Sequence, residues 1–459
     1  MSATDYNAWS KADLIARLTK LEARLPSPPP QPQALAGPST PTVNPDFARL
    51  PRRKIALRFC YAGEEYSGLA FQSAALSTPT VEGTLFNALA RARLVDAAAG
   101  PEGCGWERSG RTDRGVSGAG NVVSLWVRSA FGEVVREVDE EGGSGKLRYV
   151  HILNLLLPPS IRVLAWSPVA SSFSARFATR ARHYKYFFAP DGLSLSRMAS
   201  GAYYLVGEHD FRNLCRVDAS KQLTSFRRRI LRADVGTTPD GLGVLDLVGS
   251  AFLYNQVRHI MAVLFLIGAG LEPPALVRAL LNADKAAPDF DPAMEIVDRR
   301  PDYQMADALP LVLWDCQYAP EDVQWRTDDE YSDVDGGDGV SVVDELAAAH
   351  HRSRVRAALD AHFLLAARAF HEPSPRAAML PLARTPAEDP EPVKQARGVA
   401  VPLGGGQFRR VRKYVPVMER ARLDTVEEIN RRWREGKGAR REARRAAAEM
   451  EAEGGAEDE

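Results

Sequence analysis

One short segment, residues 109–118, carries side chains whose types and spacing could do chemistry. It reads S-G-R-T-D-R-G-V-S-G and places one acid, Asp113, between two arginines, Arg111 and Arg114. Neighbouring guanidinium groups favour the ionised form of a carboxyl group, and flanking glycines let a ligand approach the backbone closely. Strand-like runs precede and follow the segment, at residues 104–109 and 120–128. We therefore expect a loop that presents a charged acid to a cleft. A hairpin loop whose acid caps a turn would have the same composition.

Two further stretches could contribute aromatic and basic side chains to such a cleft. Residues 182–186 read R-H-Y-K-Y and are expected to form a strand. Side chains alternate along a strand, so Tyr184 and Tyr186 should lie on one face of it. Residues 173–177, F-S-A-R-F, place Arg176 shortly before this strand.

An arginine inside an apolar helix is the third candidate. Residues 253–269 are strongly apolar and end before glycine and proline, which predicts a buried helix, yet they include Arg258. A buried guanidinium group is costly without an anionic partner, and Asp113 could be that partner in a bidentate pair. Alternatively, Arg258 lies at the rim of the helix and reaches water.

The elements that must position these residues follow a repeated pattern. Alternating and amphipathic periods predict two successive strand–helix–strand–strand units. This indicates an α+β protein whose two halves share one central antiparallel sheet, with helices on one face. By composition we divide the chain into residues 1–25 (a leucine-rich helix), 26–51 (a Pro-rich linker), 52–160 (the first α+β half, with the acid loop), 161–320 (the second α+β half) and 321–459 (an acidic linker, a helical extension and a basic then acidic tail).

Composition excludes several classes of protein. Lysine and arginine together number 59, as do aspartate and glutamate, but basic residues cluster at 176–185, 227–232 and 409–445, so a polyanionic partner is not excluded. The four cysteines lie far apart without a C-x-x-C pair, which argues against a zinc site and a disulfide framework. No apolar run reaches the roughly 20 residues of a membrane span, and no secretory signal is visible. We expect a soluble intracellular protein.

Taken together, four motifs resemble one enzyme family. G-R-T-D-x-G-V, F-S-A-R-F, R-x-Y-x-Y and F-L-x-x-Q-V-R occur in that order between about residues 53 and 318, and together they resemble the TruA-like tRNA pseudouridine synthases. Finer features are similar to the eukaryotic branch that acts on uridines 38 and 39 of the anticodon arm; they lie at residues 66–72, 209–215, 261–268 and 309–316. The resemblance implies the pseudouridine synthase fold, with two ferredoxin-like halves.

The resemblance also implies roles for individual residues. It makes Asp113 the essential nucleophile, Tyr184 a contact of the target base that could assist proton removal, and Arg258 the partner of the aspartate. Arg111 would hold the RNA backbone or fill the space that a flipped base leaves. The substrate-binding residues it implies are Arg111, Thr112, Gly115, Arg176, Tyr184 and Lys185. Two departures from the family pattern, Gly118 in place of the common alanine and His183 within the basic pair, affect fine specificity rather than chemistry.

The resemblance further implies that tRNA is the substrate and that the protein is a homodimer without a cofactor or metal. It implies residence in the nucleus and cytoplasm and allows a mitochondrial pool. Two other functions are consistent with parts of the sequence. One is a tRNA-binding chaperone whose catalytic centre has lapsed. The other is a glycoside hydrolase with a carboxylate nucleophile, which usually needs a second carboxylic acid as proton donor.

Overall fold

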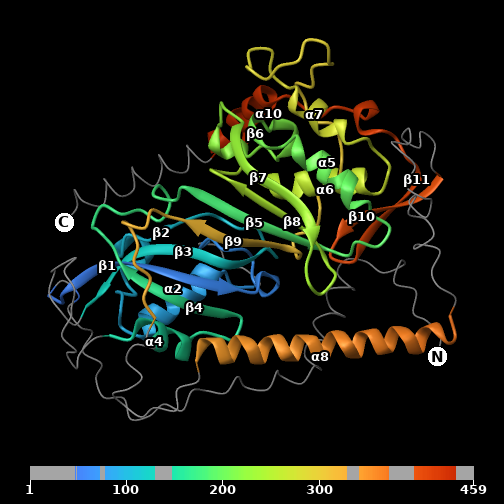
Figure 1. Cartoon of the computed structure of the whole chain (residues 1–459). Helices are drawn as coiled ribbons and strands as arrows, with labels where there is room; N and C mark the ends of the chain where they lie inside the picture. The colour runs from blue at the N-terminus through green and yellow to red at the C-terminus, as the bar shows by residue number, and fades with distance from the viewer. Residues whose placement is uncertain are drawn as a thin grey trace, which may run out of the picture. The chain divides into compact units, whose positions relative to one another are not determined.

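The computed structural model describes residues 47, 49–72, 78–129, 147–327, 341–371 and 397–440. Contacts within the chain group residues 51–459 into one compact unit, separate from residues 1–50. All helices and strands given below belong to that unit (Figure 1). The expected leucine-rich helix at 1–25, nearly all of the linker, the acidic run at 328–338 and the tail beyond 440 lie outside the described residues.

A nine-stranded sheet forms the centre of the unit. Its strand order is β4-β1-β3-β9-β5-β8-β7-β6, with β2 paired to β3. All described pairings are antiparallel except that of β3 with β9, which joins the two halves. The predicted α+β class with a central antiparallel sheet is therefore confirmed. The strands are β1 (Arg52–Tyr61), β2 (Glu107–Arg108), β3 (Ser117–Arg128), β4 (Ile161–Pro168), β5 (Ala181–Phe188), β6 (Gly207–Asp210), β7 (Arg227–Thr237), β8 (Gly243–Gly249) and β9 (Leu311–Gln317).

Helices accompany each group of strands, and a small hairpin follows in the C-terminal part (Figure 1). The helices are α2 (Val81–Arg91), α3 (Gly100–Gly103), α4 (Tyr149–Leu156), α5 (Leu195–Tyr203), α6 (Gln256–Gly268), α7 (Ala275–Leu281), α8 (Val342–Arg368) and α10 (Val426–Trp433). The hairpin consists of β10 (Arg397–Gly404) and β11 (Gln407–Lys413). In the described part of the chain, no helix is both long and apolar enough to cross a membrane.

The helices of both halves cover the same face of the sheet. Gly118 of β3 pairs with Leu313 of β9, and Leu313 pairs with Tyr184 of β5, so these three positions share one face. Tyr61 lies over Gly118, where an added Cβ would meet its ring at 2.4 Å, and it belongs to the core that includes α2 and α4. Tyr184 belongs to the core that includes α5 and α6. The opposite face is left without these helices.

The structure differs from the sequence-based expectations at several element boundaries. The apolar helix begins at Gln256 and not at residue 253, because Asn255 has the left-handed conformation (φ 58°). Residues 209–214 form the end of β6 and a single 3-10 turn, Arg212–Leu214. The strand expected at 104–109 is only Glu107–Arg108. Strand β4 pairs with β1 and so joins the strands of the first half, although it follows residue 160. The five domain boundaries stay predictions.

Candidate active site

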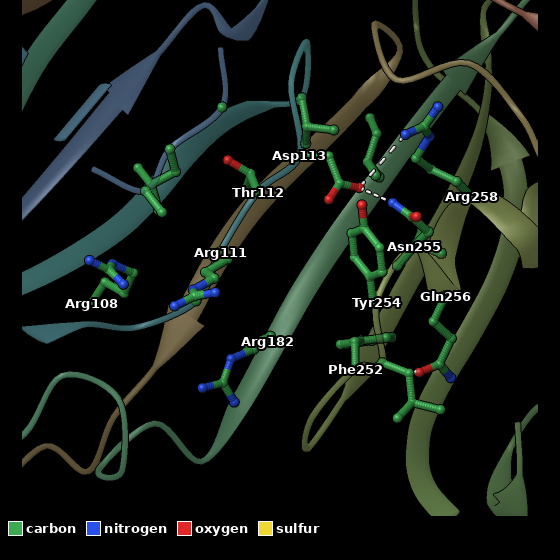
Figure 2. A pocket seen from close by; sticks show the side chains of 18 of the residues that line it. Arg108, Arg111, Thr112, Asp113, Arg182, Phe252, Tyr254, Asn255, Gln256 and Arg258 are labelled. Carbon is green, nitrogen blue, oxygen red and sulfur yellow. Dashed lines mark hydrogen bonds and ion pairs between the residues drawn. The ribbon is translucent and has the colours of Figure 1, made fainter. Parts of the chain in front are cut away.

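A cleft of about 720 Å³ opens beside the acid loop. Its lining includes residues from all four sequence motifs. Figure 2 shows Asp113 facing Asn255 and Arg258 on one side, with Arg108, Arg111 and Arg182 along the other. The lining consists of residues 67–70 and 72, residues 108–114 with Val116, the set Arg176, Arg182 and Tyr184, the pair Asp218 and Lys221, residues 251–258, and Leu311.

A buried polar network holds the acid loop against the sheet. The hydroxyl groups of Tyr61 and Thr112 form a hydrogen bond of 2.7 Å. Asn121 donates to the Tyr61 oxygen at 3.0 Å, and Ser109 donates to the Asn121 carbonyl oxygen at 2.7 Å. A turn follows in which the amide of Val116 donates to the carbonyl of Asp113 at 3.1 Å. Because buried polar networks are costly to break, the loop has one well-defined position.

Asp113 receives its short hydrogen bond from Asn255. Asn255 Nδ2 lies 2.5 Å from Asp113 Oδ2, whereas Arg258 Nη1 lies 3.7 Å from the same oxygen. The carbonyl group of Ala306 accepts from Arg258 Nε at 2.9 Å, so one edge of the guanidinium group is already occupied. The predicted meeting of Asp113 and Arg258 is therefore observed, but the expected bidentate geometry is wrong.

Burial has the largest influence on the pKa of Asp113. Removal from water raises the pKa of Asp113 above its ordinary value, and the charge of Arg258 and the hydrogen bond from Asn255 only partly oppose this. The sequence argument predicted the opposite direction, because it counted neighbouring arginines and could not see burial. A raised pKa makes the carboxylate a better base than a free aspartate.

Tyr184 lies in the wall of the cleft, on the face of β5 that was expected. Its side chain is buried, and its ring meets that of Phe252 edge to face, with 4.9 Å between centroids. Burial raises the pKa of Tyr184, so its phenol group is neutral at physiological pH. Tyr186 lies on the same face but does not line the cleft; its hydroxyl group donates to the carbonyl of Asp307 at 3.0 Å.

Comparison with known proteins adds independent information. A family model described as tRNA pseudouridine synthase matches residues 202–319. The tRNA pseudouridine(38/39) synthase of Saccharomyces cerevisiae is 38% identical over 345 residues, which cover 72% of this chain and 75% of the yeast protein. The chain belongs to the tRNA pseudouridine synthase family. The human protein of the same name is 42% identical over 302 residues (62% of this chain, 59% of the human protein), and tRNA pseudouridine synthase A of Methanosarcina mazei is 31% identical over 280 residues (61% of this chain, 89% of that protein).

In this pseudouridine synthase, two residues at the cleft were not singled out from the sequence. Arg182 donates to the carbonyl of Ser109 at 2.6 Å and 3.1 Å, and to that of Ser250 at 3.0 Å. It therefore ties the acid loop and the segment before α6 to β5. Asn255 was read only as part of a motif. Its signal is an asparagine directly before a helix, a residue that tolerates left-handed backbone better than most.

Positively charged side chains surround the mouth of the cleft. Arg111, Arg114 and Arg176 are exposed, and within the described residues their side chains form neither a hydrogen bond nor an ion pair with an acid. Thr112 is buried in the polar network, and Gly115 shapes the turn with a φ of 83° without lining the cleft. Nowhere in the described chain do histidine, cysteine, aspartate and glutamate side chains form a group that could hold a metal ion.

Lys185, which the family resemblance places among the substrate-binding residues, does not line this cleft. It follows Tyr184 on β5 and points to the opposite face, where its amino group lies 3.5 Å from Asp246 and 4.6 Å from the centroid of the Trp314 ring. In the basic cluster at 227–232, the first arginine is already paired with acids. Arg227 forms ion pairs with Glu208 and Asp289, at 3.3 Å and 3.2 Å.

Proposed function

We propose that this protein converts uridine to pseudouridine in tRNA, with Asp113 as the catalytic carboxylate. The observation that carries the proposal is the placement of this one carboxylate: partly desolvated, fixed by Asn255 and Arg258, and facing a cleft with a cationic rim. The other acid that lines the cleft, Asp218, is paired with Lys221 at 3.3 Å.

The state of Asp218 argues against a glycoside hydrolase. Such an enzyme needs an acid whose raised pKa keeps it protonated at neutral pH. Burial acts to raise the pKa of Asp218, but hydrogen bonds from Ser220 and Lys221 outweigh this and lower it. Asp218 is therefore ionised and cannot donate the proton that a leaving group requires.

The isomerisation breaks the N1–C1′ bond of uridine, rotates the uracil and forms a C5–C1′ bond, while C5 loses a proton and N1 gains one. In one route the Asp113 carboxylate bonds to the nucleotide and is later displaced. In the other it removes the C2′ proton, which expels the uracil and leaves a glycal; uracil C5 then bonds to C1′ while the proton returns to C2′. Both routes use a carboxylate of raised basicity. The neutral phenol of Tyr184 suits packing against an uncharged base better than removing a proton from it.

The substrate follows from the family and the charge of the cleft. The relatives named tRNA pseudouridine(38/39) synthase support uridines 38 and 39 of the anticodon arm as the targets. Flipping a base out of its stack costs a few kcal/mol, and contacts in the cleft would offset this cost. Arg111, Arg114 and Arg176 would bind phosphates around the flipped nucleotide. From the family resemblance alone, we also propose that the protein is a homodimer and that it resides in the nucleus and cytoplasm, with a mitochondrial pool.

The test compares the two acids of the cleft. Asp113→Ala should lower the single-turnover rate of pseudouridine formation by on the order of 10⁴-fold or more, as expected for loss of a nucleophile, while tRNA affinity is retained. Tritium release from tRNA labelled at C5 of uridine measures the rate, and filter binding measures the affinity. Asp218→Ala is the matched control and should stay within about tenfold of the wild type. Comparable activity in Asp113→Ala would overturn the proposal; wild-type protein that binds tRNA without tritium release would point to the chaperone.

A further inference from the structure

The C-terminal hairpin β10–β11 is fixed to the catalytic body. The amide of Asp307 donates to the carbonyl of Leu403 at 2.7 Å, and the Tyr186 hydroxyl group also reaches this carbonyl, at 3.4 Å. Gly404 has a φ of 86°, and an added Cβ would lie 2.2 Å from the Tyr186 oxygen. Val399 is buried in the core that contains α6. The turn of the hairpin is thus packed directly against the sheet.

The chain that leaves the hairpin is held as well. Glu272 is 3% exposed and accepts hydrogen bonds from the Tyr414 hydroxyl group at 2.6 Å and from the amide of Val417 at 2.7 Å. A buried carboxylate with two donors is a specific anchor, because either donor alone would leave it underpaired. Strand β11 is therefore held at both ends on the half that carries Asn255 and Arg258.

This fixed strand has an unusual charge pattern. Four of its seven residues are cations, and β10 and the glycine turn contain no acid. All four are exposed, and none forms a hydrogen bond or ion pair through its side chain within the described ranges. Arg227 and Arg232 of β7, by contrast, are paired with acids. The four cations are Arg409, Arg410, Arg412 and Lys413.

Strand alternation separates these cations into two faces. Arg409 and Lys413 line a groove of about 420 Å³ that also contains two acids, Asp302 and Glu419. Arg410 and Arg412 are absent from that groove and lie on the other face of the strand. Neither Arg410 nor Arg412 forms a side-chain ion pair or hydrogen bond with any residue that the structure describes.

We propose that the Arg410 and Arg412 face of the hairpin binds the sugar–phosphate backbone of tRNA outside the catalytic cleft. The inference rests on the proposed function, because it takes tRNA as the substrate. A cleft of about 720 Å³ has room for a flipped nucleotide but not for a tRNA, so most of the polyanion must lie on the outer surface. Cations on a rigid ribbon suit contacts with phosphates, which fix the position and orientation of a nucleic acid without reading its sequence.

The test compares two double variants, each of which removes two positive charges from a different part of the protein. Arg410→Ala/Arg412→Ala should weaken binding of unmodified tRNA on the order of tenfold near physiological salt. The slope of log affinity against log salt should become shallower by about 1.4 to 1.8, because two phosphate contacts are lost. KM should rise while kcat at saturating tRNA is unchanged. The control Arg352→Ala/Arg354→Ala removes the same charge from exposed positions of α8 and should leave the affinity, the salt slope and KM unchanged.

The outcomes separate this proposal from the catalytic one. If the hairpin variant keeps the affinity and the salt slope of the wild type, the hairpin is not a tRNA contact and the proposal is wrong. If both variants weaken binding equally, only the total charge matters and the proposed face is wrong. Absence of tritium release from the wild-type protein would contradict the catalytic role of Asp113, yet the binding comparison would still decide the role of the hairpin.

Discussion

Strand β5 separates two regions of opposite character. On one face, Arg182 and Tyr184 line the cleft. On the other, His183 and Lys185 both meet Asp246, at 2.8 Å and 3.5 Å, and Arg232 of β7 pairs with the same carboxylate. Lys185 and Arg232 are thus already paired with an acid, and these ion pairs are partly exposed, so they contribute little to stability.

The cleft face is organised in the opposite way. Its acid, Asp113, is partly desolvated, while Arg111 and Arg114 beside it have no acidic partner in the described chain. This arrangement leaves positive charge available for a phosphate and a carboxylate available for chemistry. The comparison teaches that the number of charges says little about function on this sheet. Whether each charge already has a partner is the informative property.

Among variants that keep Asp113, the largest effect should come from removing the side chain that orients it. Because Asn255 is left-handed, glycine is the appropriate replacement: it removes the amide and keeps the backbone unstrained. Asn255→Gly should lower kcat about 10- to 100-fold with little change in KM, since a misplaced reacting group can cost about that much. Single-turnover tritium release measures the effect. Asn255→Ala adds backbone strain, so a glycine variant that keeps the full rate while alanine loses it would show that only the backbone matters.

A second effect is the position of the acid limb of the pH–rate profile. Burial raises the pKa of Asp113, so its reactive ionised form is lost at a higher pH than for a free aspartate as the solution is acidified. The rate should therefore begin to fall above the range in which ordinary aspartates titrate. Asn255 lowers this pKa, so in Asn255→Gly the limb should move to still higher pH. A profile that is identical in wild type and variant would remove Asn255 from the electrostatics of the site.

The same raised pKa has a consequence for stability. Ionised Asp113 disfavours folding at pH values above its folded-state pKa, and this cost disappears below the pKa of the unfolded chain. The charge is thus kept in the cleft at the expense of stability, a trade that functional sites commonly show. Asp246 on the opposite face of β5 shows the reverse, because its cationic neighbours lower its pKa despite its burial.

The sequence could predict the α+β class and the meeting of Asp113 with Arg258, because each motif carries its own chemistry and the folding pattern brings them together. It could not predict that Asn255 provides the short hydrogen bond, since this depends on where α6 begins. Nor could it predict the direction of the pKa of Asp113, which burial decides. The sequence could, in principle, have predicted that Lys185 does not line the cleft. Alternation along β5 places Lys185 opposite Tyr184, but its position within a basic motif suggested a phosphate contact.

The smallest effect is expected for Lys185→Ala, and this variant tests directly whether only the cleft face of β5 contacts tRNA. Lys185→Ala should change KM for tRNA and kcat by less than about twofold, because only a partly exposed ion pair and a contact with Trp314 are lost. Arg176→Ala removes one positive charge from the mouth of the cleft and should raise KM several-fold, with a salt dependence reduced by about one phosphate contact. Steady-state kinetics at two salt concentrations compare the variants. If Lys185→Ala weakens binding as much as Arg176→Ala, tRNA must reach both faces of the sheet. A charge that is already paired with an acid would then still contribute to tRNA binding.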